Sequence, residues 1–536
     1  MWKRDLLFVT VIAGAILAMG GVLSRELPET EASIPANILP DDSLSRSVST
    51  LNASFEKLWD EQGVTPTDQA PDLTIARRLS LALMGTIPSL EEIRLFESAP
   101  ASSRIGWWVD RLLKDRRWSD YMAERLARAY VGSGEGPFVI YRRRRFVLWL
   151  AEQLHSGRPY DELVRNLIQS RGIWTDQPET NFITIAINPD NQELSETQLA
   201  GTISRVFLGI RIDCAECHDH PFDDWTQEEF HGLAAFFGQT KSFFTGIGED
   251  DDLYHLAGNT PEEDRVIAPA VPFQQGLLPE EGPLRDRLGS WITHPDNRAF
   301  PRATVNRVWA LMFGRPLIDP VDNIDPDSPL IGSLDLLAKE FVSTGYDLRR
   351  LICTIALSRV FQIDSKATGE DNLSESRQQY WAAFPLIRLR PEQLVGSILQ
   401  ATSLSTIDYH SHIIVRLARA IGQNDFIDRY GDAGADELEP QGATIPQHLL
   451  MMNGELVAEK TEYNLLGAPG RISRLAPDNA SAIEISFLST LSRRPSKLEQ
   501  EHFLKQLSEE KSGGTASCQE NMYWALINST EFSWNH

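Results

Sequence analysis

The chain has few cysteines and is short of positive charge. Four cysteines occur in 536 residues, Cys214, Cys217, Cys353 and Cys518, which is too few for a disulfide-held scaffold. Lysine and arginine total 51 against 75 aspartates and glutamates, so the net charge is −24. Because nucleic-acid phosphates require a cationic surface, this balance argues against nucleic acid as a partner. It also disfavours adhesion to anionic lipid.

Common catalytic motifs and strand patterns are scarce as well. The sequence has no G-x-S-x-G nucleophile elbow, no phosphate-binding loop and no HExxH zinc motif. Few segments alternate between apolar and polar residues, so we expect short strands near residues 180–187 and 265–274 and little other sheet.

Helix-start signals are frequent by comparison. Ser89 with Glu92 and Thr226 with Glu229 have capping-box spacing, and Asp347 can cap an apolar helix that follows it. The sequence therefore predicts a mainly α-helical protein, with two helical domains and few short strands after an N-terminal membrane-spanning or signal helix.

That N-terminal helix is predicted from one long apolar run, residues 6–23, which follows Lys3 and Arg4. Eighteen residues at helical rise span ~27 Å, close to the thickness of a bilayer core. The positive flank places the rest of the chain outside the cytoplasm, in the periplasm or at the cell exterior. An uncleaved anchor and a signal peptide cleaved after Gly20 are equally consistent. No cysteine follows the run, which excludes a lipoprotein anchor.

Composition shifts divide the remaining chain. Two segments are poor in apolar residues, one rich in Pro and Ser and one carrying the acidic run 249–252. The second could bind calcium, although a solvated connector is the better interpretation. The predicted parts are a signal peptide or anchor (1–24), a polar linker (25–50), a first helical domain (51–245), an acidic linker (246–285) and a second helical domain (286–536).

The most informative motif is C-x-x-C-H, formed by Cys214, Cys217 and His218. Two thiols at this spacing can form thioether bonds to one haem, and the adjoining imidazole can bind the iron. We therefore expect haem c, with Cys214 and Cys217 as attachment points and His218 as the proximal ligand. His220 is too near in sequence to reach the opposite face. His231, Met451 and Met452 are candidates for the distal position, which can also stay open.

Two alternatives use the same residues. Two thiolates and the imidazoles of His218, His220 and His231 form a donor set suited to structural zinc or mononuclear iron. An oxidising compartment also permits a disulfide between Cys214 and Cys217. The same compartment permits a bond between Cys353 and Cys518, and the sequence favours neither outcome for that pair.

The surroundings of the motif resemble a known family. The stretch FLGIRIDCAECHDHPFDDWTQEEFHGLAAFF is similar to the secreted cytochrome-like proteins of planctomycetes, whose domain of unknown function carries C-x-x-C-H-x-H-P-F, Trp, Thr-Gln and Leu-Ala-Ala-Phe-Phe. The C-terminal half resembles the companion domain of unknown function usually fused to it, through residues 306–309 and 345–348. His231 departs from the pattern, because the family often has a tyrosine there.

The resemblance implies an exported c-type cytochrome-like redox protein. It implies electron transfer with an unknown partner, or haem-dependent oxidation linked to an extracellular substrate, in association with polysaccharide-processing systems. The alternative is a non-catalytic binding or assembly protein that uses the Cys/His cluster as a structural site. The sequence leaves open whether the protein is an enzyme.

Two charged clusters have competing interpretations. The run Arg142 to Arg145 could bind an anionic group, but such runs are more often a helix face paired with carboxylates. Asp322, Asp325 and Asp327 could bind calcium, but a loop closed by Asx-turns is the commoner outcome.

Overall fold

Several helices begin at the capping residues that the sequence indicates. In helix α4 (Leu90–Ser98) the Ser89 side chain accepts from the backbone of Glu92, whose carboxylate bonds back to Ser89. Thr226 and Glu229 form the same box at helix α11 (Gln227–Ala234). Asp347 accepts two backbone N–H groups at the start of α15 (Leu348–Ala356). These predicted helix starts are confirmed, because each cap satisfies donors that the first turn leaves unpaired.

A computed structural model describes most of the chain beyond residue 41. The described residues are 42–134, 141–188, 191, 193–221, 223–256, 264–366, 375–408, 411, 426–427, 429–431, 438, 444–464, 467–509 and 515–536. The predicted signal or anchor helix, residues 6–23, lies outside them. Among the described residues, no helix combines the length and apolar character that crossing a membrane requires.

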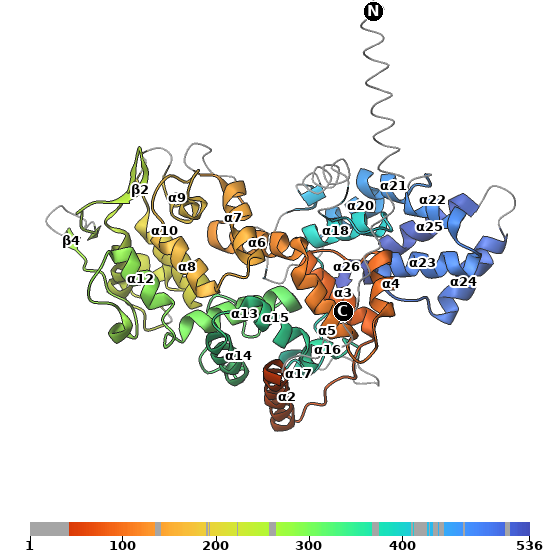
Figure 1. The fold of residues 1–536 in the computed structure, drawn as a ribbon, viewed down its shortest axis with the longest axis horizontal. Helices are drawn as coiled ribbons and strands as arrows, with labels where there is room; N and C mark the ends of the chain where they lie inside the picture. Colours follow the sequence, from red (N-terminus) through yellow and green to blue (C-terminus); the bar gives the residue numbers. More distant parts are fainter. Residues whose placement is uncertain are drawn as a thin grey trace, which may run out of the picture. The chain divides into compact units, whose positions relative to one another are not determined.

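The first half of the described chain is helical with two short hairpins (Figure 1). Its elements are α2 (Asp42–Gln62), α3 (Asp72–Met84), α4, α5 (Arg104–Lys114), α6 (Arg116–Val131), α7 (Arg143–His155), α8 (Tyr160–Gln169), η1 (Pro178–Thr180), α9 (Asn181–Thr184), α10 (Glu196–Ile203), the π-turn η2 (Ser204–Leu208), η3 (Asp213–Glu216), α11, η4 (Ala235–Phe237), β1 (Thr240–Phe243), β2 (Gly246–Glu249), β3 (His255–Leu256) and β4 (Arg265–Val266).

The second half continues in the same way (Figure 1). Its elements are η6 (Gln275–Leu277), α12 (Leu284–Ile292), α13 (Ala299–Phe313), α14 (Ile331–Ser343), α15, α16 (Arg359–Gln362), α17 (Glu375–Gln379), β5 (Ile387–Arg388), α18 (Pro391–Ala401), α20 (Ile445–Asn453), α21 (Glu455–Thr461), α22 (Ala468–Leu475), α23 (Asn479–Leu491), α24 (Lys497–Glu509), α25 (Thr515–Ile527), α26 (Thr530–Ser533) and β6 (Trp534–Asn535). The mainly helical fold is confirmed, and the described strands pair as antiparallel β1–β2, β3–β4 and β5–β6.

One strand prediction is wrong. Within the segment 180–187, expected to include a strand, residues 180–184 form the end of η1 and helix α9, and Ile187 makes only a single antiparallel bridge with Leu194. The buried Asn181 side chain donates to the carbonyls of Trp174 and Pro178 and accepts from the backbone of Arg142. Phe182 is fully buried beside it. These tertiary contacts override the β propensity of the local sequence. Near 265–274 a strand does form, but it is confined to β4.

Helix α13 lies at the centre of the core and contacts α3, α14 and α15. Its Trp309 is fully buried. That indole stacks on Phe313 with ring centres 4.4 Å apart and meets the edge of Trp381 at 5.2 Å. Phe55 of α2 also stacks on it, with ring centres 5.7 Å apart. Aromatic packing therefore joins segments that are distant in sequence.

Helix α3 is joined to the C-terminal helices by two buried arginines. Arg77 donates to the carbonyls of Thr490 and Phe532. Arg78 donates to three carbonyls, those of Phe361, Ile363 and His536. Burial lowers the pKa of Arg77 to about 10 and that of Arg78 to about 9. Leu81 of the same helix belongs to the apolar cluster of α18, α23 and α25.

The predicted linkers carry structure of their own. Helix α2 begins at Asp42, inside the segment 25–50. Within 246–285, strand β2 pairs with β1. Gly246 packs closely against Gly172: a Cβ on Gly246 would lie 2.2 Å from the Gly172 carbonyl. Glu249 of β2 bonds to the buried Arg285 of α12. Residues 40–536 form one compact unit, in which the acidic segment packs against its neighbours.

Candidate functional site: the C-x-x-C-H turn

The motif lies on a short 3-10 turn, η3, between the π-helical segment η2 and helix α11. Gly209 ends η2 in the left-handed conformation, with φ 65°. Ile212 and Ala215 are buried at 1% and 0% exposure and hold the turn against the core. The side chains between and beyond them, Cys214 and Cys217, are exposed. Because Ile212 and Ala215 point into the core, the thiols of Cys214 and Cys217 face solvent.

Asp213 fixes the start of the turn. Its carboxylate accepts from Arg205 at 2.9 Å. A Cβ on Gly201 would lie only 2.5 Å from the same oxygen, so a larger residue at position 201 would displace the Asp213 carboxylate. Burial raises the pKa of Asp213, while Arg205 opposes that effect.

The carbonyl oxygen of Glu216 is the main attachment point of the turn. His231 Nε2 lies 2.9 Å from it, and the Gln227 side-chain amide donates to it at 3.2 Å. Since a carbonyl can only accept, His231 carries its proton on Nε2, and Nδ1 accepts from the Tyr254 hydroxyl at 2.8 Å. His231 is 2% exposed. Both of its ring nitrogens are therefore engaged inside the protein.

His218 makes one bond with its ring. Nδ1 lies 2.7 Å from the carbonyl oxygen of Asp219, so Nδ1 donates and Nε2 keeps its lone pair. No described residue bonds to that Nε2. The Asp219 carboxylate accepts from the backbone of Gln227 at 2.8 Å, which links the loop to the start of α11.

His220 closes the loop that follows. Its backbone N–H donates to the Trp225 carbonyl at 2.8 Å, and its Nδ1 accepts from the backbone of Asp223 at 2.9 Å. Its side chain is 10% exposed. Phe222 of the same tail lies outside the described residues.

The predicted site residues thus fall into two groups. Cys214, Cys217 and His218 share one exposed turn, whereas His220 and His231 hold the backbone around it. Within the described part of the chain, no three His, Cys, Asp or Glu side chains gather closely enough to hold a metal ion.

All four cysteines are free thiols in this structure, so neither the alternative Cys214–Cys217 disulfide nor a Cys353–Cys518 bond is formed. Burial raises the pKa of Cys353 to about 12. Cys518 is 6% exposed and belongs to the C-terminal apolar cluster.

The candidate distal methionines lie on α20. Met451 is buried in that C-terminal cluster, whose members include no residue of the motif turn or of α11. Met452 is 47% exposed.

The loop 320–327 packs directly beside the motif segment. Arg211 pairs with Asp322 at 2.8 Å, and Ile324 N–H donates to the Gly209 carbonyl at 2.9 Å. Asp325 accepts from the backbone of Asp327, which is the expected Asx-turn. An open hollow of about 530 Å³ lies beside the contact between Gly209 and Ile324. Its wall includes Asp223, Asp224 and Trp225.

The arginine run is built into the fold. Arg143 makes a bidentate pair with Glu124, at 2.7 and 3.1 Å. Arg145 donates to the Thr175 carbonyl. Carboxylate and carbonyl partners therefore account for two members of the run, as the helix-face interpretation expects.

Sequence reasoning missed Gln227, Tyr254 and the Glu216 carbonyl as parts of the site. Tyr254 lies in the predicted linker. Every residue has a backbone carbonyl, so the sequence cannot single out that of Glu216 as a hydrogen-bond acceptor. The Thr-Gln pair of the motif was visible, but its role as an anchor for the turn appears only from the hydrogen bonds.

Comparison with known proteins places two family regions on this fold. No curated protein and no solved structure matches the chain. Residues 284–414 match the family described as "PSD1: Protein of unknown function (DUF1553)". Residues 50–242, which contain the motif turn, match "PSCyt2: Protein of unknown function (DUF1549)". The chain therefore carries these two families in tandem, in the order expected from its resemblance.

Proposed function

We propose that this chain is an exported, c-type cytochrome-like redox protein of the planctomycete kind, which binds haem covalently through Cys214 and Cys217. His218 would supply the imidazole that binds its iron. The observation that carries the proposal is the combination of two exposed free thiols with an adjacent imidazole whose Nδ1 is held by a carbonyl. Such a hydrogen bond fixes the tautomer and raises the basicity of the ligating nitrogen.

The donor set of the turn fits haem c. Thioether formation requires free sulfurs that a large planar group can approach, and both cysteines are exposed. Axial ligation requires an imidazole nitrogen with an available lone pair, and the hydrogen bond at Nδ1 assigns that lone pair to Nε2 of His218. When bound, the haem supplies one-electron chemistry.

The protein contributes a fixed and exposed platform. His231 and Gln227 hold the Glu216 carbonyl, and Asp219 ties the following loop to α11. Cys214 and Cys217 therefore keep their spacing without help from a metal. An exposed attachment turn also suits electron exchange with a partner protein, because the transfer distance stays short.

The alternative is a binding or assembly protein with zinc or iron at the Cys/His cluster. That site needs His220 or His231 to turn toward the sulfurs, and each would first lose its present hydrogen bonds. Hydrogen bonds already hold the motif turn in place, so a metal ion is not needed for that purpose. This favours the haem proposal over the metal alternative.

The remaining parts of the proposal follow from the sequence. Residues 6–23 would direct export to the periplasm or cell exterior and, if uncleaved, hold the chain at the membrane. The resemblance supports a role in oxidation or electron transfer linked to an extracellular substrate, with polysaccharide-processing systems as the expected setting.

Expression with cytochrome maturation machinery tests the proposal. We expect a Soret absorption band that stays with the polypeptide after acid-acetone extraction, because thioether bonds survive this treatment. The Cys217→Ala variant should lose at least one thioether bond, and Cys353→Ala serves as the matched control that keeps the pigment. A colourless protein with stoichiometric zinc or iron by elemental analysis would support the alternative and refute the haem proposal.

A further inference from the structure

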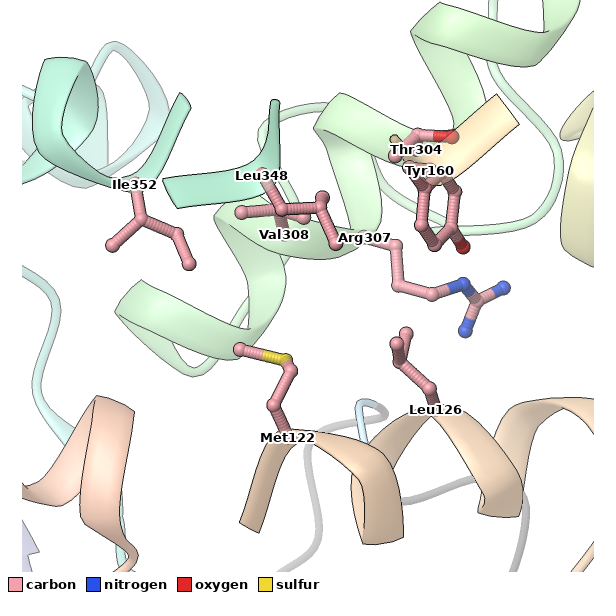
Figure 2. Close-up of a pocket in the computed structure, with 8 residues that line it drawn as sticks. All are labelled: Met122, Leu126, Tyr160, Thr304, Arg307, Val308, Leu348 and Ile352. Atoms are coloured by element: carbon pink, nitrogen blue, oxygen red, sulfur yellow. The ribbon is translucent and has the colours of Figure 1, made fainter. Parts of the chain in front are cut away.

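The enclosed cavity on the core side of α13 is too small for an organic ligand. Figure 2 shows its walls, which include Met122 and Leu126 of α6 and Val308 of α13. Its volume is about 10 Å³, and the surface that faces it is apolar. A single water molecule would fill such a space. Larger spaces lie at the N-terminal end of the same helix.

Two open hollows meet at that end of α13. One, of about 530 Å³, lies beside the tail of the motif, with Trp225 and Phe273 in its wall. The other, of about 550 Å³, lies between the start of α13 and helix α14, where Val342 forms part of the wall. Gln274 and Arg298 line both hollows, so the two are adjoining parts of one depression, the α13 groove. Each part has the size of a small-molecule site.

The α13 groove is built where the two family regions meet. Residues 208–210 and 223–225 of the first region form one side. Residues 323–324 and the start of α13 come from the second region. Phe273 and Gln274 belong to the segment between them. Junctions of this kind are preferred places for ligand sites.

Two cations of the groove have no partner within the described ranges. Arg298 and Lys339 are exposed, and no hydrogen bond or ion pair joins either side chain to another described residue. Arg302, by contrast, donates twice to Asp335, at 2.5 and 2.9 Å, and so neutralises that carboxylate. The other carboxylate of this hollow, Asp296, is 80% exposed. In a chain with a net charge of −24, two unpaired cations in one hollow favour an anion as ligand.

The motif end of the groove carries the opposite charge together with aromatic rings. Asp223 and Asp224 are exposed in the wall beside Trp225. The half-buried ring of Phe273 is held against Trp291, with ring centres 5.1 Å apart. This end therefore repels an anion and suits a flat, uncharged body that carries a hydrogen-bond donor.

Gln274 occupies the point where the two hollows meet. Its φ of 48° is left-handed, a conformation that residues other than glycine rarely adopt. Its side-chain amide donates to the carbonyl of Asp296 at 2.9 Å, which fixes the residue in the wall. Residues held in such conformations are concentrated at ligand-binding positions.

We propose that the α13 groove binds an organic acid with a flat, hydroxylated body. Arg298 and Lys339 hold its carboxylate or sulfate group, because both are free and a guanidinium matches the geometry of either anion. The body lies along Phe273 and Trp225, with its hydroxyl directed to the carboxylates at the motif end. The C-x-x-C-H turn contributes no side chain to either hollow, so binding does not depend on haem.

Calorimetric titration of the full chain with 4-hydroxycinnamate at low ionic strength tests the groove. We expect one saturable site per chain, with or without haem. The methyl ester has the same body without the charge, and it should bind at least about tenfold more weakly, because charge-assisted hydrogen bonds are lost. 4-Nitrophenyl sulfate is the sulfate counterpart, and the tighter of the two anions identifies the preferred group.

Single substitutions locate the binding. Arg298→Gln and Lys339→Gln should each weaken the tighter anion several-fold and keep the unfolding midpoint, since both side chains are exposed. Arg144→Gln and Lys497→Gln are matched controls, because they remove exposed cations that line neither hollow, and they should leave the affinity unchanged.

Four results would overturn the proposal. They are no saturable binding of either organic anion, equal affinity for the acid and its ester, inorganic sulfate that binds as tightly as the organic anions, and equal losses of affinity in the groove variants and their controls.

Discussion

The Nε2 atom of His231 lies 2.9 Å from the carbonyl oxygen of Glu216, one of the two residues between the cysteines of the motif. Its other nitrogen accepts from Tyr254 at 2.8 Å. The histidine that resembles a distal ligand in the sequence therefore acts through the backbone, as a positioning residue for the sulfurs.

Replacing His231 should loosen the motif turn without changing the haem ligands. In His231→Phe the Glu216 carbonyl loses a donor, and we expect the free energy of unfolding to fall by about 1–3 kcal/mol. In the haem-free protein, Cys214 and Cys217 should react faster with a thiol reagent. Tyr254→Phe removes only the hydrogen bond from the Tyr254 hydroxyl to His231, which does not touch the motif turn itself. It should therefore lower the free energy of unfolding by less than His231→Phe does. A changed spin state in the absorption spectrum of haem-loaded His231→Phe would instead identify His231 as a ligand.

The second axial position of the bound haem should accept an external ligand. His231 uses both ring nitrogens, and Met451 is packed in another part of the core. Added imidazole should therefore shift the Soret band of the loaded protein in a saturable way. A spectrum that is insensitive to imidazole would show that a protein side chain already occupies the position.

Substitution of Gly209 should weaken the junction between the two family regions. Its φ of 65° disfavours other residues, and a Cβ would lie 2.8 Å from the Ile324 side chain. Gly63 has a φ of 63° and nothing within 4 Å of that position, so it is a matched control. We expect Gly63→Ala to cost about 1–2 kcal/mol for backbone strain alone. Gly209→Ala should cost about 1–3 kcal/mol more, through overpacking. Equal losses in denaturant unfolding would argue against a close contact at Ile324.

Acid should weaken the C-terminal helices through Glu499. Hydrogen bonds from Arg493 are the largest cause that lowers its pKa, from 4.5 to about 2. A carboxylate with a lowered pKa stabilises the folded state above its unfolded pKa, and this contribution is lost as the pH falls from about 4.5 to 2. Arg493→Gln should flatten that part of the stability profile. Arg494→Gln removes a neighbouring arginine that pairs with Glu97 and Glu484 instead, and it should leave the Glu499 contribution in place. Parallel profiles for the two variants would contradict this assignment.

Local chemistry explains which features could be predicted. Capping signals at Ser89, Thr226 and Asp347 depend on residues a few positions apart, and the structure confirms them. The role of His231 depends on which groups the fold brings near it, and sequence spacing holds no such information. The same limit explains residues 180–187, where the buried bonds of Asn181 decide the conformation.

Intact mass spectrometry under denaturing conditions tests the central claim most directly. After expression with haem-attachment machinery, the account predicts that the polypeptide is heavier by the mass of one haem, and that a Cys214→Ala, Cys217→Ala double variant has the mass of the bare chain. A wild-type chain of unmodified mass, from cells in which a control cytochrome is matured, would contradict it.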